Sequence, residues 1–161
     1  MTARLLRDRG GLATVEFAVV GSIFILLVCV AIDLGMLLTT QSALDNAARD
    51  GARLILTGQV QNGGGAALFQ TQVCADVSSL IPCAKLVYSV TSGSGFAALS
   101  PSMQAGGTVG ATPFSPGTSG QDVLVQVGYS RPFLIPWVGR TLGGNGSVLL
   151  VSTVAFQNDP F

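Results

Sequence analysis

The sequence predicts an α+β protein, in which a long N-terminal transmembrane helix extends into a domain with a small antiparallel sheet of three or more strands. The helix is predicted by an apolar block, Gly11–Leu38, that follows a basic leader and has no charged residue from Phe17 to Ile32. At about 1.5 Å per residue this block reaches roughly 42 Å, enough to cross a bilayer. The strands are predicted by three later stretches rich in β-branched residues, at 84–91, 122–130 and 147–156.

The composition narrows the possible functions. The 161 residues leave room for one membrane segment and one small folded domain. Basic and acidic residues balance at 8 each, so the whole chain has no electrostatic attraction to nucleic acid. Only 10% of residues are charged, against about 25% in ordinary soluble domains, which is typical of a chain that lies against lipid or other protein. Without histidine the commonest general base and metal ligand are missing, so we predict no enzyme, cofactor or metal site.

Four segments follow from these patterns: a leader at 1–11, a membrane helix at 12–38, its continuation outside the membrane at 39–58, and a C-terminal α+β domain at 59–161. Basic residues directly before an apolar segment favour retention in the cytoplasm. The leader has this character through Arg4, Arg7 and Arg9. The N-terminus is therefore predicted inside and the C-terminal domain outside.

The helical continuation has apolar and small residues at helical spacing. Leu44, Ala47 and Gly51 fall on one face, and the small side chains allow another element to approach closely. The helix is predicted to end near Thr57, with Gly58 as its C-cap.

The C-terminal domain reads as short elements separated by loops. We expect a loop at 59–67, a short helix at 68–80, and at 92–120 a long loop or flexible insertion that is not a core element and is rich in Gly, Ser, Thr and Pro. The segment 131–140 is interrupted by proline. Phe133 and Trp137 in it are expected as satellite core, with partner contact as the alternative.

The cysteines divide by position. Cys29 lies in the apolar block and is expected as a small apolar filler. Cys74 and Cys83 lie in the later domain, where a disulfide between them is expected if that domain is outside the cytoplasm. The alternative is a pair of reduced, buried thiols.

Three interpretations of the leader and apolar block compete. A cleaved signal peptide would need a small-residue site after the block, and Glu16 at its front is unfavourable. A plain single-pass anchor leaves Glu16 unexplained. In the third, a peptidase cuts on the cytoplasmic side, after Gly11, so that Leu12 becomes the N-terminus and Glu16 and Phe17 become mature positions five and six.

The third interpretation gives Glu16 a role. An acidic residue near the bilayer centre costs on the order of 2.5–3.5 kcal/mol, and less near the membrane face. The new α-amino group of a neighbouring subunit is a cation that could pair with it. Asp33, near the other end of the block, is expected at headgroup level, with contact to a neighbouring helix as the alternative.

The stretch RDRGGLATVEFAVVGSIFILLVCVAIDLG resembles the N-terminal signature of TadE/TadF-like pilin proteins of tight-adherence (Tad, Flp-type) type IV pili. The resemblance extends into TTQSALDNAARDGARLIL and reappears in VLVQVGYSRPFLIPWVGRTLG and SVLLVSTVAFQNDPF, whereas 92–120 departs from the family. It implies a pilin-like domain and processing after Gly11 by a prepilin peptidase.

The resemblance also implies a minor pilin or pseudopilin-like subunit in the bacterial inner membrane, with a periplasmic C-terminal domain and possible incorporation into the extracellular pilus. Its implied partners are other pilins, the prepilin peptidase, the inner-membrane assembly machinery and the lipid bilayer, but not nucleic acid. The alternative is a membrane-anchored or secreted extracytoplasmic binding module.

Overall fold

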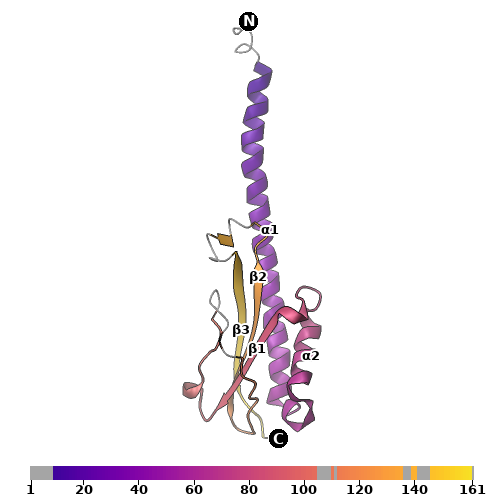
Figure 1. Cartoon of the computed structure of the whole chain (residues 1–161), viewed down its shortest axis with the longest axis vertical. Coiled ribbons are helices and arrows are strands. Elements are labelled where there is room, and N and C mark those ends of the chain that lie inside the picture. Colours follow the sequence, from indigo (N-terminus) through magenta and orange to yellow (C-terminus); the bar gives the residue numbers. More distant parts are fainter. Residues whose placement is uncertain (1–8, 105–109, 111, 136–138, 141–145, 161) are drawn as a thin grey trace. The chain divides into compact units, whose positions relative to one another are not determined.

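The computed structural model describes residues 9–104, 110, 112–135, 139–140 and 146–160. The chain divides into two compact units, Met1–Met36 and Leu37–Phe161. Helix α1, Arg9–Leu56, is 48 residues long and belongs to both (Figure 1). Within the second unit, strands β1 (Leu86–Gly93), β2 (Asp122–Pro132) and β3 (Ser147–Gln157) form an antiparallel sheet in the order β1-β2-β3. The predicted α+β class, with a long N-terminal helix and a small antiparallel sheet, is confirmed.

The end of α1 is closed by glycine, as predicted. Gly58 has a φ of +73°, in the left-handed region that glycine enters without a Cβ penalty. Its N–H donates to Ile55 O at 3.0 Å, and the N–H of Gln59 donates to Leu54 O at 3.0 Å. These two bonds form a Schellman motif, which satisfies carbonyls that the helix would otherwise leave unpaired.

The expected loop at 59–67 is wrong in its second half. A π-helical turn, Val60–Gly64, follows α1, and helix α2, Gly65–Val77, begins directly after it. Gly63 at φ +141° and Gly65 at φ +56° reverse the chain between the helices. The glycine run therefore makes a compact corner, and the alanines after it already belong to α2. The short helix expected at 68–80 is confirmed, with earlier bounds.

The core of the second unit lies between α1, α2 and one sheet face (Figure 1). Alternate residues of β2 point to this face, as expected for a strand of period two. The helical continuation predicted from the small-residue pattern supplies the opposite wall. The buried core residues are Leu44, Ala47, Ala48, Ala52 and Ile55 on α1, Phe69, Val73 and Val77 on α2, Leu86, Val90, Val123, Val125, Val127, Tyr129 and Leu150 on the sheet, and Val60 and Ile81 in the connecting segments.

Gly51 lies where α2 approaches α1 closely. A Cβ built on Gly51 would lie 2.7 Å from Phe69 Cε2 and 2.7 Å from Val73 Cγ2. Both neighbours are buried and have few alternative rotamers, so they cannot easily move away. The absence of a side chain at residue 51 is therefore a condition for docking α2.

The expectation that 92–120 is not a core element is wrong for two of its side chains, Met103 and Phe114. Met103 is 2% exposed and covers the second face of the sheet, where its Sδ would lie 2.8 Å from a Cβ on Gly128. Phe114 packs against Phe69 with ring centroids 5.7 Å apart. The segment is anchored rather than free because its few large apolar side chains have specific places on the sheet.

Gln126 holds this segment by hydrogen bonds. Its side chain is 2% exposed, and its Oε1 accepts from the backbone N–H of Ser102 at 2.7 Å and of Met103 at 3.1 Å. Its Nε2 donates to Met103 O at 2.9 Å and to Thr153 Oγ1 at 3.2 Å. These bonds take the place of the hydrogen bonds that the Gln126 amide would make to water. A buried amide without partners would destabilise the fold.

The polar C-terminal tail is also fixed. Asn158 is 3% exposed, and its Nδ2 donates to Pro116 O at 2.9 Å and to Thr118 O at 3.1 Å. The N–H of Asp159 donates to Leu56 O at 3.2 Å, so the tail closes over the last turn of α1.

We predict that Gly51→Ala destabilises the second unit. Alanine improves helix propensity by about 1 kcal/mol, but overpacking against Phe69 and Val73 typically costs about 1–3 kcal/mol. Thermal unfolding of the full chain in detergent, followed by circular dichroism, should therefore show a lower Tm. Asn46→Ala, on the exposed face of the same helix, is the matched control. A Gly51→Ala protein as stable as this control would contradict the packing argument.

Candidate assembly site on the N-terminal helix

The first unit consists of the apolar half of α1, whose side chains are largely exposed. Phe17 is 79% exposed, and Val15, Ile23, Phe24 and Leu27 are each at least half exposed. Among the described residues, one helix is long and apolar enough to cross a membrane. A continuous apolar surface of this size requires a cover of lipid or protein. The first unit is thus compatible with a single-pass membrane anchor.

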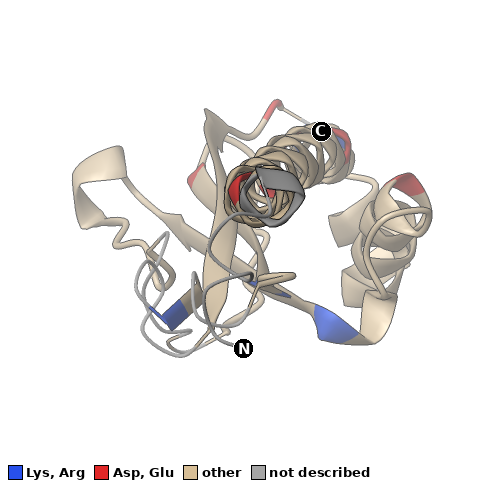
Figure 2. Ribbon diagram, turned by 90° about the horizontal axis from the view of Figure 1, so that it is seen from above, with Lys and Arg blue, Asp and Glu red and all other residues tan. Residues whose placement is uncertain are grey.

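Within the described part of α1, Glu16 is the one acidic side chain near the start of this surface. It is exposed, and together with Val15, Val19 and Val20 it lines an open hollow on the side of α1. Charged residues are sparse along the described ribbon, as Figure 2 shows. The carboxylate therefore stands among aliphatic groups, where a cation brought by another molecule would find an acceptor with few competitors.

The predicted processing site, Gly11 and Leu12, lies just after the first residue of α1, Arg9. Residues 1–8 of the predicted leader are outside the described residues. Cleavage after Gly11 would leave Leu12 as the first residue of the remaining helix. Glu16 would then stand one helical turn from the new α-amino group, because four residues make about one turn.

The other predicted positions differ in their surroundings. Asp33 is 4% exposed, although its neighbours Ile32 and Leu34 are about half exposed. Its predicted role as a helix contact stays a prediction. Phe133 is half-buried after the end of β2, and its N–H donates to Gly146 O at 3.1 Å. Trp137 lies outside the described residues, so the predicted partner contact at Phe133 and Trp137 also stays a prediction.

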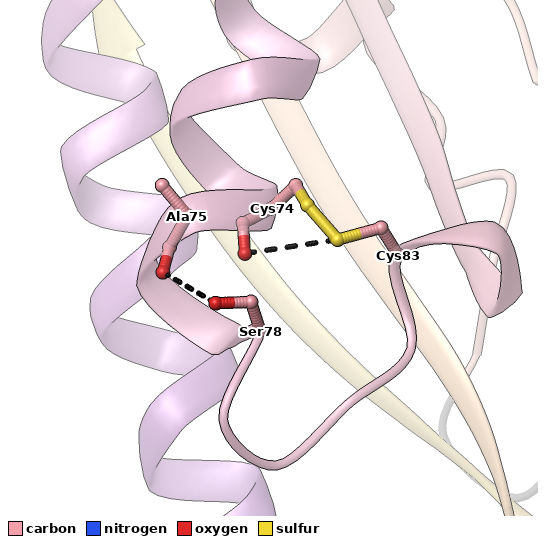
Figure 3. Close-up of a disulfide and its surroundings, with 4 residues drawn as sticks. All are labelled: Cys74, Ala75, Ser78 and Cys83. Atoms are coloured by element: carbon pink, nitrogen blue, oxygen red, sulfur yellow. Dashed lines mark hydrogen bonds between the residues drawn. A yellow bond between two sulfur atoms is a disulfide. The ribbon is translucent and has the colours of Figure 1, made fainter.

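The predicted disulfide is present. Cys74, near the end of α2, is bonded to Cys83, at the start of a 3-10 turn that leads into β1, with Cα atoms 5.3 Å apart (Figure 3). Ser78 Oγ donates to Ala75 O at 3.2 Å and supports the turn between them. The disulfide ties α2 to the sheet, and Ile81 inside the closed loop is buried.

Sequence reasoning missed the polar anchors Gln126 and Asn158. A glutamine in a strand and an asparagine in a polar tail ordinarily face solvent. The only sequence signal for Gln126 was its place inside an otherwise apolar strand, where a polar residue needs a partner. Nothing in the sequence indicated that the partners would be Ser102 and Met103.

The titratable groups of the described residues form no metal site, and the one resolved pKa shift belongs to a core tyrosine. No group of three or more Cys, Asp or Glu able to hold a metal occurs within the part of the chain that the structure describes. Burial raises the pKa of Tyr88, which packs edge-on against Phe69 at 5.8 Å between ring centroids. This environment fits a core residue.

These features define a class: an α+β domain carried by a long apolar helix with an acidic residue close to its start. Compared with known families, residues 11–53 match the TadE-like protein family. The match covers α1 from the predicted processing site almost to the helix end and confirms the resemblance inferred from the sequence there. No curated protein and no solved structure is significantly similar to the chain.

The disulfide gives a prediction about thiol chemistry. Protein taken from membranes and denatured without reductant should be alkylated at Cys29 only, because Cys29 is free and exposed while Cys74 and Cys83 are bonded. Alkylation followed by peptide mass spectrometry measures this, and labelling should reach all 3 cysteines after reduction. Cys29→Ser is the control and should show no label before reduction. Labelled Cys74 without reductant would show that the pair is not oxidised in the cell.

Proposed function

We propose that the chain is a minor pilin or pseudopilin-like subunit of a Tad-type type IV pilus. The observation that carries this proposal is Glu16, exposed among apolar side chains at a fixed spacing after Gly11, within the segment that matches the TadE-like family. The family suggests an association with the Tad pilus. A family of this kind is structural rather than catalytic, which agrees with the prediction that the chain is not an enzyme.

The first proposed step is insertion into the bacterial inner membrane by the apolar half of α1. The basic leader keeps the N-terminus in the cytoplasm, and the second unit is exported to the periplasm. The Cys74–Cys83 disulfide supports this orientation, because disulfides form and persist in oxidising compartments. The prepilin peptidase then cuts after Gly11 on the cytoplasmic side.

The second proposed step is transfer from lipid to protein. Other pilins cover the exposed apolar side chains of α1, and Glu16 pairs with the new α-amino group of a neighbour. Pairing lowers the cost of keeping a carboxylate in an apolar setting and also fixes the register of adjacent helices. The inner-membrane assembly machinery is the partner that would move the subunit into the extracellular pilus.

An anchored binding module is the alternative function. In that case α1 is only an anchor, the N-terminus remains uncut, and the Phe133–Trp137 region contacts a ligand. Glu16 then has no role, and the two experiments that follow separate the alternatives.

The first experiment tests processing. The intact mass and N-terminal residue of the membrane protein should show a start at Leu12, and Gly11→Leu should retain the full leader, because a large side chain obstructs an extended peptide in the protease site. Gly21→Ala is the control, since a Cβ there has open space. A start at Met1 or Thr2 in the natural protein would support the anchored module, and a start after Ala31 would indicate a secreted domain.

The second experiment tests Glu16. Glu16→Ala should insert into the membrane as well as the natural protein but lose most of its incorporation into sheared pili, because the neighbour's amino group loses its partner. Immunoblots of membrane and pilus fractions measure both steps. Ser22→Ala, an exposed position whose Oγ only bonds Val19 O at 2.9 Å, is the control. Incorporation of Glu16→Ala into pili at the natural level would contradict the proposed role of Glu16 in assembly.

A further inference from the structure

The connection that leads from β2 to β3 begins with three apolar residues, 133–135, which we call the apolar tip. Leu134 in the apolar tip is 61% exposed, and Phe133 and Ile135 are half-buried. A single exposed leucine is ordinary on a protein surface, so its meaning depends on where in the molecule it lies. Its position follows from how the end of β2 is placed along α1 within the second unit.

Two hydrogen bonds within the second unit show that α1 and β3 run side by side in the same direction. Gln41 Nε2 donates to Val151 O at 3.2 Å, and the N–H of Asp159 donates to Leu56 O at 3.2 Å. Between these two contacts the helix rises about 22 Å, and the extended chain from Val151 to Asp159 spans about 26 Å. Because the two lengths are similar, levels along α1 can be compared with levels along β3.

The end of β2 reaches beyond the end of the apolar block. The last residue of this block, Leu38, belongs to the second unit and is 68% exposed. From Gln41 back to Leu38 the helix rises about 4.5 Å, whereas from Val151 back to Ser147 the strand extends about 13 Å. Ser147 pairs with Pro132, the residue before the apolar tip. The apolar tip therefore starts about 8 Å beyond the level of Leu38, on the side from which α1 enters the second unit.

We propose that the apolar tip lies in the surface of the bilayer that holds α1, where the headgroups meet the acyl chains. The apolar block is roughly 42 Å long, about the thickness of a bilayer with its headgroups, so Leu38 marks the outer edge of the headgroup layer. This layer is about 5–8 Å deep, and the apolar tip starts about that far inside its edge. The inference rests on the proposed insertion of α1 into the membrane.

The charges near the apolar tip agree with a lipid surface. Arg140, in the same connection, is exposed, and the sequence has no Asp or Glu between Asp122 and Asp159. A basic side chain close to exposed apolar groups is typical of segments that bind at the surface of anionic lipids. The chemistry that this part of the second unit recognises is therefore an anionic phospholipid headgroup together with the acyl chains below it.

Tryptophan quenching in lipid vesicles tests the inference. The chain has a single tryptophan, so Trp137→Phe gives a full-length background without one. Leu134→Trp in this background is reconstituted at low density into vesicles of phosphatidylcholine and phosphatidylglycerol that are brominated near the headgroup end of their acyl chains. Its fluorescence should be quenched several-fold more than that of Phe96→Trp, a half-exposed position that follows β1 at the opposite end of the sheet.

Phe24→Trp, exposed in the apolar block, is the control for insertion of α1. If Phe24→Trp is quenched and Leu134→Trp is not, the apolar tip stays in water and the inference is overturned, while the proposed insertion stands. If Leu134→Trp becomes shielded only as the protein density in the vesicles rises, a neighbouring subunit covers the tip, which also overturns the inference. An unquenched Phe24→Trp would overturn the proposed insertion and the inference with it.

A charge variant tests the contact with headgroups. Quenching of Leu134→Trp should increase with the share of phosphatidylglycerol, and Arg140→Gln should remove most of this increase, because the headgroups lose a cationic partner. Arg53→Gln, exposed near the far end of α1, is the matched control and should keep the increase. Equal increases in both would overturn the inferred contact of Arg140. Failure of the pilin role is measured separately, by the mature N-terminus and the Glu16→Ala pilus fraction.

Discussion

The second unit depends on the close contact between α1 and the elements packed over it. One face of α1 consists of small residues, Ala47, Ala48 and Gly51. The space beside this face is filled by Phe69 and Val73 of α2. Without this approach α2 would lose the wall on which it is buried, and the Cys74–Cys83 bond would tie it only to the sheet. The disulfide and the apolar packing thus both hold α2 in place.

α1 has to satisfy two environments with one continuous helix. Its first part carries large exposed apolar side chains, suited to lipid or to other helices, and its second part carries small buried residues suited to a folded core. The proposed transfer from lipid to a bundle of pilin helices would give Glu16, near the start of α1, a role in fixing the register of adjacent helices.

Much of the fold could be predicted because local patterns are strong where one face is buried. The helical spacing of Leu44, Ala47 and Gly51 and the alternation in 122–130 and 147–156 are enforced by the core. The C-cap at Gly58 could be predicted because a helix end often needs a residue that tolerates positive φ. The segment 92–120 was misread because anchoring by Met103 and Phe114 depends on single side chains in a polar surrounding, which leave no periodic signal.

By itself, the sequence determined the membrane-length helix, its end, the disulfide pair and the spacing between Gly11 and Glu16. These are local properties, set by the order of apolar, charged, glycine and cysteine residues along the chain. Only the tertiary structure decided the strand order, the covering of the second sheet face through Gln126, and the covering of the β1 edge by the segment that contains Ser115. Those depend on pairings between residues far apart in the chain, such as Val90 with Ser115 and Gln126 with Ser102. No local pattern records these pairings, because the same backbone groups could bond to many alternative partners.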